Sequence, residues 1–85
     1  MTTTAAGAAR HAAVWADRAE TAHETAKTRR AKGRELESQR LSAGARDWYE
    51  RAEGAEKQRG TAVTMANMWA NVAGVLHLVE EGESS

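Results

Sequence analysis

Small residues recur in this chain at alternating steps of three and four, and this spacing constrains the fold more than any other feature. One series runs from Ala8 to Leu36, and a second runs from Ala45 to Leu76. Alternation of three and four is the heptad spacing of a helix with one seam that faces another helix. The spacing therefore predicts two long helices that pack along alanine-lined seams, as in a coiled coil.

The two series do not share one register, and the change of register indicates a turn. It falls between Leu36 and Ala45. Ser42 in this segment suits a helix N-cap, and Gly44 suits a turn position. We therefore predict a turn at residues 42–44 that joins the two helices into an antiparallel hairpin.

The composition agrees with a single all-α domain. The chain has 85 residues and no proline, and it is rich in Ala, Glu and Arg, which are good helix formers. No run alternates between polar and apolar residues as a strand does. The predicted layout of domain 1–85 is a frayed N-terminus at 1–4, a first helix at 5–41, the turn at 42–44, a second helix at 45–80 and a flexible acidic tail at 81–85.

Folding the chain about residue 42 places the large residues of the two helices in shared layers. Trp15 then faces Trp69, and Leu36 faces Trp48. Alanines between these layers allow the two backbones to approach closely. The predicted seam consists of Ala8, Ala12, Trp15, Ala19, Ala22, Ala26, Leu36, Trp48, Ala52, Ala55, Ala62, Ala66, Trp69, Ala73 and Leu76.

Three glycines oppose long helices, because each glycine costs about 1 kcal/mol within a helix. They are Gly33, Gly54 and Gly60, and Thr61 after Gly60 suits a new N-cap. The alternative architecture is a three-helix bundle with breaks near Gly33 and Gly60. The hairpin is favoured because the heptad spacing passes through both positions in phase.

The stretch 61–79 contains no charged residue, although the rest of the chain is charged every few residues. Its length approaches the roughly 20 apolar residues that a membrane span needs. However, Asn67, Asn71 and His77 lie within it, and such residues are costly in lipid. We therefore predict no membrane span and interpret the stretch as a helix with two apolar sides.

On a helical wheel, only one of these apolar sides has a counterpart within the chain. The alanine side matches the alanine-rich first helix, whereas the side with large residues has no internal partner. Two hairpins that pack these sides together would form a four-helix bundle. The leading hypothesis is thus a non-enzymatic assembly or adaptor module that binds itself or another helical protein. The predicted self-association face consists of Met65, Met68, Val72, Val75 and Val79.

A basic run in the first helix provides an alternative function, a small nucleic-acid-binding regulator. The possible polyanion contacts are Lys27, Arg29, Arg30, Lys32 and Arg34. The whole chain has 12 Lys and Arg against 12 Asp and Glu, so it lacks the basic excess of most such proteins. Glu50, Glu53 and Glu56 face the run in the hairpin, and we expect them to pair with it.

No combination of residues predicts catalysis, a metal or a cofactor. Glu20 and His23 have the spacing of di-iron helical bundles, but the facing segment 61–68 supplies no carboxylate. His11 and His77 are expected near the open end of the hairpin as polar surface residues. There is no cysteine, so thiolate metal sites and disulfides are excluded.

The helix layout resembles that of the WXG100 family, small secreted helical hairpins with a tryptophan near the turn. Trp48 has this position, but Tyr49 and Glu50 follow it, so the Trp-x-Gly tripeptide is absent. Tyr49 and Glu53 match the family's Tyr-x-x-x-Asp/Glu export signal, although they lie in mid-chain. The resemblance implies a secreted partner protein as a further alternative.

The N-terminal residues lack the basic segment and apolar core of a secretory signal peptide. We therefore expect a cytoplasmic protein, with leaderless export left open. The Ala- and Arg-rich usage is typical of a bacterial genome of high GC content.

Overall fold

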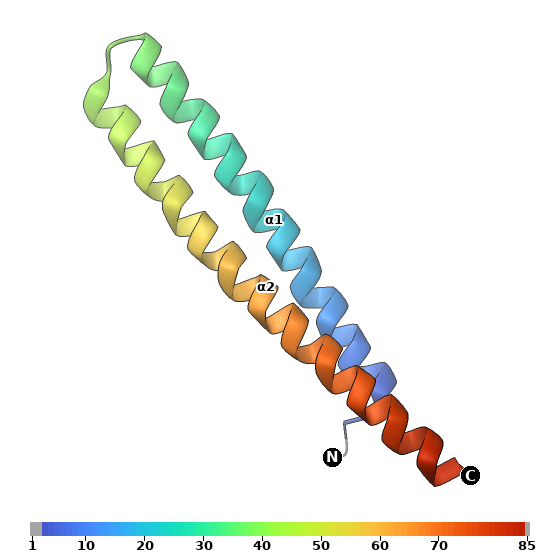
Figure 1. The fold of residues 1–85 in the computed structure, drawn as a ribbon. Helices are drawn as coiled ribbons and strands as arrows, with labels where there is room; N and C mark the ends of the chain where they lie inside the picture. The colour runs from blue at the N-terminus through green and yellow to red at the C-terminus, as the bar shows by residue number, and fades with distance from the viewer. Residues whose placement is uncertain (1–2, 85) are drawn as a thin grey trace.

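The computed structural model describes residues 3–84, which form two long helices. Helix α1 spans Ala5–Ser38 and helix α2 spans Ser42–Ser84. The helices run antiparallel as an extended hairpin of 68 × 17 × 13 Å, with the turn at one end and both termini toward the other (Figure 1). No strand occurs in residues 3–84. The predicted all-α hairpin is therefore confirmed.

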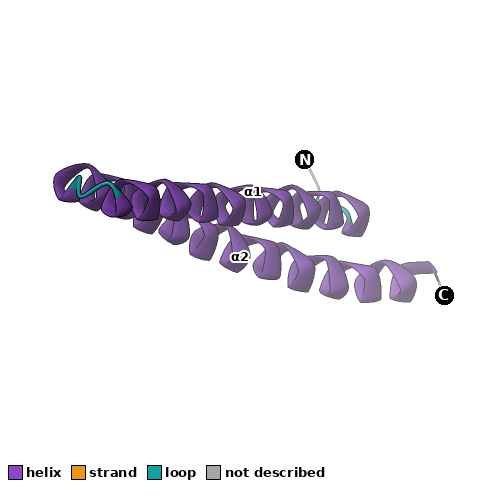
Figure 2. Cartoon of the chain, turned by 90° about the horizontal axis from the view of Figure 1, so that it is seen from above, coloured by secondary structure: helices purple, strands orange, loops and turns teal. Residues whose placement is uncertain are grey.

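The helices also twist about each other along the length of the hairpin. Near the turn, the two helices are separate in Figure 1 and overlap in the view from above in Figure 2. Near the open end, they overlap in Figure 1 and are separate in Figure 2. A continuous twist keeps the alanine seam of each helix facing its neighbour.

Neither helix breaks at a glycine, so the three-helix alternative is wrong. Gly33 lies within α1, and both Gly54 and Gly60 lie within α2. Gly33 has a specific reason to be glycine, because a Cβ there would lie only 2.7 Å from Cε1 of Tyr49. The tyrosine ring from α2 thus occupies the space that a side chain at position 33 would fill.

The turn lies at residues 39–41, three residues before the predicted position of 42–44. The amide of Arg40 donates to the carbonyl of Glu37, and the amide of Leu41 donates to that of Leu36, both at 2.9 Å. Arg40 adopts a φ of 61°. These features form a Schellman cap, which ends a helix at a left-handed residue. Because the cap is complete at Leu41, α2 begins at Ser42, and Gly44 is part of the helix.

Two hydrogen bonds satisfy backbone amides in the first turn of α1, at the open end of the hairpin. Thr4, which lies in the segment predicted to be frayed, caps α1 by accepting a hydrogen bond of 3.0 Å from the amide of Gly7. The amide of Ala5 donates to Oε1 of Glu80 at 2.9 Å, which places a carboxylate at the positive end of α1. The predicted flexible tail is instead helical through Ser84, although it contains Gly82. Residues 1–2 and 85 lie outside the described residues.

The core of the hairpin is a strip of alanines. No large side chain is fully buried in the described residues. Alanine seams allow close backbone approach but bury little apolar area per residue. The buried alanines are Ala8, Ala19, Ala22, Ala26, Ala45, Ala52, Ala55 and Ala62.

Candidate association surface

The predicted seam residues are all buried or half-buried, but their burial differs along the hairpin. No residue of α2 in the range 63–83 is buried, whereas four alanines of α2 up to Ala62 are. The fully buried seam residues are Ala8, Ala19, Ala22, Ala26, Ala52, Ala55 and Ala62. The half-buried ones are Ala12, Trp15, Leu36, Trp48, Ala66, Trp69, Ala73 and Leu76.

The predicted self-association face flanks the seam along the second half of α2. Met65 and Val72 are half-buried beside the seam. Met68, Val75 and Val79 point further outward and are 42%, 62% and 50% exposed. We name these five residues the ridge. The ridge is a line of large apolar side chains that α1 does not cover.

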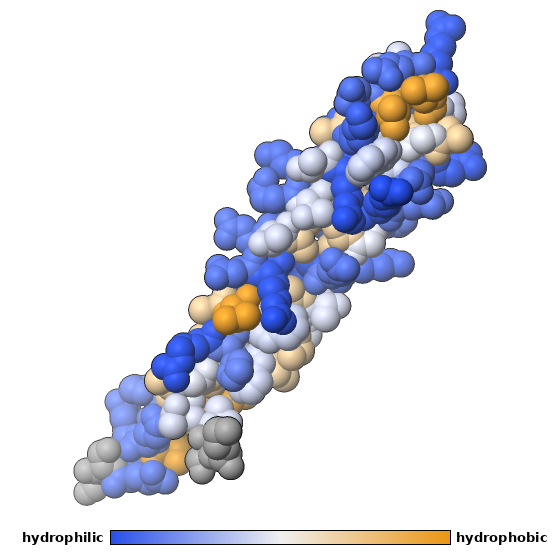
Figure 3. Space-filling view, turned by 180° about the vertical axis from the view of Figure 1, so that it is seen from behind, coloured by the Kyte–Doolittle hydropathy of each residue, from blue (hydrophilic) through white to orange (hydrophobic). Residues whose placement is uncertain are grey.

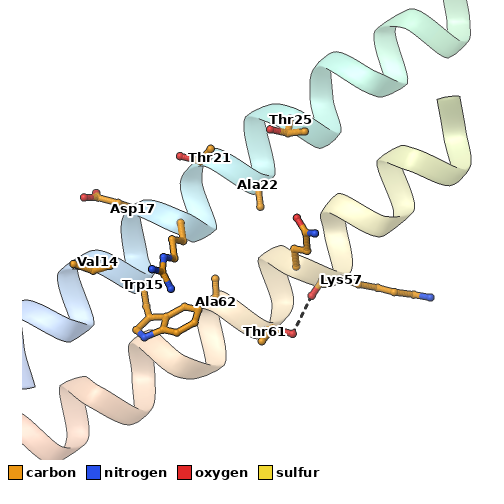
Figure 4. Close-up of a pocket in the computed structure, with 11 residues that line it drawn as sticks. Val14, Trp15, Asp17, Thr21, Ala22, Thr25, Lys57, Thr61 and Ala62 are labelled. Atoms are coloured by element: carbon orange, nitrogen blue, oxygen red, sulfur yellow. Dashed lines mark hydrogen bonds between the residues drawn. The ribbon is translucent and has the colours of Figure 1, made fainter.

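A groove lies on the hairpin beside the ridge, toward the turn. It has a volume of about 720 Å³ and is walled by threonines and aliphatic stems. Ala22 and Ala62 point into the space between the helices, and the ring of Trp15 lies beside Ala62 (Figure 4). The guanidinium of Arg18 lies 4.4 Å from the centre of the Trp15 ring. Because its floor is alanine, the groove offers a hollow for larger side chains.

The groove and the ridge are parts of one continuous face. Thr61 lines the groove, and it also lines a smaller hollow that includes Thr64 and Met65. Val14, which is 48% exposed, borders the groove on α1. Sequence reasoning identified the ridge but missed the groove. The sequence carries no clear signal for the groove, because residues of both helices form it.

Apolar side chains outside this face are more scattered. Leu78 is 69% exposed and lies on the side of α2 away from the seam, and Leu41 is exposed in the turn. Seen from behind, the hairpin has separate apolar patches near the turn and further along, divided by hydrophilic side chains (Figure 3). Single exposed apolar residues are ordinary on protein surfaces, whereas a continuous line is not.

The basic run makes several contacts within the hairpin. Nη2 of Arg30 lies 3.0 Å from Oε1 of Glu56. Nη1 of Arg29 donates to the carbonyl of Arg51 at 2.9 Å, and Nζ of Lys32 lies 3.4 Å from Oε2 of Glu35. Of the expected partners, Glu56 therefore engages the run. Lys27 and Arg34 are exposed, and nucleic-acid binding stays a prediction.

The candidate metal ligands of the sequence do not form a common site. His11 stacks on Trp69 with 4.5 Å between ring centroids, whereas Nε2 of His77 lies 3.1 Å from Oε1 of Glu81. Glu20 and His23 are exposed on α1. In residues 3–83, no group of three His, Asp or Glu side chains could hold a metal ion.

Tyr49 is the residue with a shifted pKa. Its ring is half-buried beside Gly33. Desolvation raises the pKa of the Tyr49 hydroxyl, and a hydrogen bond and the negative charge of Glu37 raise it further, while Arg34 lowers it. The half-buried ring of Tyr49 thus packs between the two helices in the turn-side half of the hairpin.

Helix α2 is also long and apolar enough to cross a membrane, judged by length and composition alone. Little of its apolar segment is buried within the hairpin. A soluble helix that packs on a partner passes the same test. The membrane alternative is therefore included in the experiments below.

Two of the residues that resemble the WXG100 pattern, Trp48 and Tyr49, are half-buried in the hairpin. Trp48 is half-buried with the guanidinium of Arg51 at 4.9 Å from its ring centre, and Glu53 is exposed. No family model, curated protein or solved structure matches this chain. The resemblance therefore stays a prediction.

Proposed function

We propose that this chain is a non-enzymatic assembly module that binds a second copy of itself through the ridge and forms a four-helix bundle. The observation that supports this proposal is the distribution of apolar side chains. The core is alanine, while Met68, Val75 and Val79 are largely outside it. A hairpin built in this way has large apolar side chains available for a second chain.

The energetics favour association. Full burial of a Val or Met side chain contributes about 1.5–3 kcal/mol, so the exposed ridge residues hold hydrophobic stabilisation that the single hairpin does not use. Chains below about 80 residues rarely gain more than about 3–5 kcal/mol from one core, and this hairpin of 85 residues has a core of alanines. Oligomerisation is a common way for such small folds to gain stability.

Other functions receive less support from the same surface. A nucleic-acid site would require free cations, but Arg29, Arg30 and Lys32 contact groups within the hairpin. The ridge itself contains no charge. Its chemistry suits another apolar helical surface, and a second copy always supplies one.

Analytical ultracentrifugation at micromolar concentration tests the proposal. We expect the mass of a dimer, twice the 9.2 kDa of one chain. Met68→Glu should weaken association by about tenfold or more, because the interface would bury an unpaired carboxylate. Leu78→Glu is the matched control on the other side of α2, and it should remain a dimer. A wild-type chain that is monomeric throughout would refute the proposal.

A further inference from the structure

Residues at steps of seven follow one line along each helix of the association face. On α2 this line contains Thr61, Met68 and Val75, and on α1 it contains Val14 and Thr21. Val14, Thr21 and Thr61 all border the groove, so both lines lie on the same face of the hairpin. The face is therefore a strip that extends over both helices.

The size of the side chains changes along this strip. Toward the open end it presents large residues such as Val75 and Val79, which stand out from the helix. Toward the turn it presents Thr61 and Thr25 around an alanine floor. A surface that projects on one half and is hollow on the other can complement itself through a two-fold axis between the halves.

We infer that two hairpins pair antiparallel about an axis near Met68, so that the ridge of each copy occupies the groove of the other. This inference rests on the proposed self-association and adds its geometry. Val75 then lies opposite Thr61 of the second copy, and Val72 lies opposite Thr64. The two Met68 side chains meet at the axis.

The hydroxyl groups of Thr61 and Thr64 already have hydrogen-bond partners within α2, so an apolar neighbour can cover them. Oγ1 of Thr61 donates to the carbonyl of Lys57 at 3.2 Å, and Oγ1 of Thr64 donates to that of Gly60 at 3.1 Å. Each of these two hydroxyls therefore keeps a hydrogen bond when water leaves. Covering these threonines with valines leaves no unsatisfied donor.

The charges favour the antiparallel arrangement over a parallel one. Antiparallel pairing places Lys57 opposite Val79 of the second copy, one helical turn from its Glu83. The same register places Glu53 opposite Glu83, so the acidic end meets a segment of mixed charge. The stem of Lys57 can cover Val79 while its ammonium group stays in water. Parallel pairing would instead bring the acidic ends of both copies together, and like charges disfavour association.

The arrangement also predicts the shape of the dimer. With the axis at Met68, each turn lies 28 residues away, or about 42 Å at about 1.5 Å per residue. The antiparallel dimer should be about 84 Å long. A parallel dimer would keep the length of the single hairpin, which is 68 Å.

Cross-linking of single cysteines tests this geometry, because the natural chain contains no cysteine. A short bismaleimide should link two Met68→Cys chains into a covalent dimer. Val75→Cys alone should link poorly, because the two sites would lie about 21 Å apart at about 1.5 Å per residue. A mixture of Val75→Cys and Thr61→Cys should give the mixed dimer.

The outcomes separate this inference from the proposed function. A dimer by sedimentation in which Met68→Cys links to Val14→Cys, and not to itself, would overturn the antiparallel arrangement and leave self-association standing. Small-angle scattering that gives a length near 68 Å would do the same. A wild-type monomer would overturn both, and its flotation with phospholipid vesicles would assign the ridge to a lipid surface.

Discussion

The half of the hairpin next to the turn completes its own packing, whereas the open half leaves large apolar side chains uncovered. In the turn-side half, Tyr49 packs on Gly33, and Arg30 pairs with Glu56. In the open half, α2 has no buried residue beyond Ala62 within 63–83. Both halves share the same alanine seam, so the difference arises from the residues that flank it.

This difference separates the part of the chain that maintains the fold from the part available for binding. Flanking residues in the turn-side half are charged or aromatic and find partners on the opposite helix. Flanking residues in the open half are the ridge residues, which find none within the hairpin. Substitutions in the two halves should therefore affect different measurements, stability in one and association in the other.

The largest expected effect is that of Trp69→Ala in the open half. Trp69 is half-buried at the seam and stacks on His11. We expect a loss of about 2–3 kcal/mol in the free energy of unfolding, less than the roughly 3–5 kcal/mol of a fully buried tryptophan. Urea unfolding measures it, with Leu78→Ala as an exposed control that should change stability by under about 0.5 kcal/mol. Equal urea midpoints for both variants would mean that Trp69 contributes no packing.

The second effect, in the turn-side half, is that of Gly33→Ala. A new Cβ would collide with the ring of Tyr49, and such overpacking costs about 1–3 kcal/mol. The unfolding free energy should fall by this amount while the dimer mass at saturating concentration stays unchanged. In a Tyr49→Ala background the same substitution should be neutral or stabilising, because the ring is gone. Similar losses in both backgrounds would contradict the role of Tyr49.

Two glycines within α2, Gly54 and Gly60, should respond in the opposite direction to Gly33. Gly54 and Gly60 have no atom within 4 Å of an added Cβ. Gly54→Ala and Gly60→Ala should each raise stability by about 0.5–1 kcal/mol, because alanine restricts the unfolded chain and favours helix. Thermal unfolding of each variant checks this, and a loss in either would reveal a contact with a second chain at that position.

The hairpin could be predicted because its seam follows one simple rule. Alternation of three and four depends only on helix geometry, and it continues through Gly33 and Gly60. The predicted layer of Trp15 and Trp69 is not confirmed, because Trp69 stacks on His11 and the Trp15 ring lies beside Ala62. Short-range periodicity therefore contains enough information for an all-α fold of two helices.

The turn and the groove could not be predicted, because they depend on features that periodicity does not contain. The cap uses Arg40 at a positive φ, where glycine or asparagine is usual, so Gly44 attracted the prediction. The packing of the Tyr49 ring against Gly33 depends on the rotation of α2 about its own axis. The groove depends on how residues of the two helices, among them Trp15, Ala22 and Ala62, are positioned relative to one another.

The smallest expected effect is the dependence of stability on alkaline pH. The pKa of Tyr49 is raised in the folded chain by desolvation and by Glu37. The protonated form is therefore favoured by folding, and this contribution is fully present below the unfolded pKa of about 10. As the pH rises through the folded pKa, the contribution is lost and stability should decrease.

The chain contains a single tyrosine, so absorbance of the tyrosinate ion reports this titration directly. We expect a midpoint above that of the urea-unfolded chain. Tyr49→Phe keeps the ring beside Gly33 but removes the ionisable hydroxyl, so its stability should decline less between pH 9 and 11, on either side of the ordinary tyrosine pKa of about 10. Because Gly33 and Tyr49 lie in the turn-side half, the dimer mass should not change through this titration until the hairpin unfolds. Dissociation of a still-helical chain at the Tyr49 midpoint would show that the two halves are coupled.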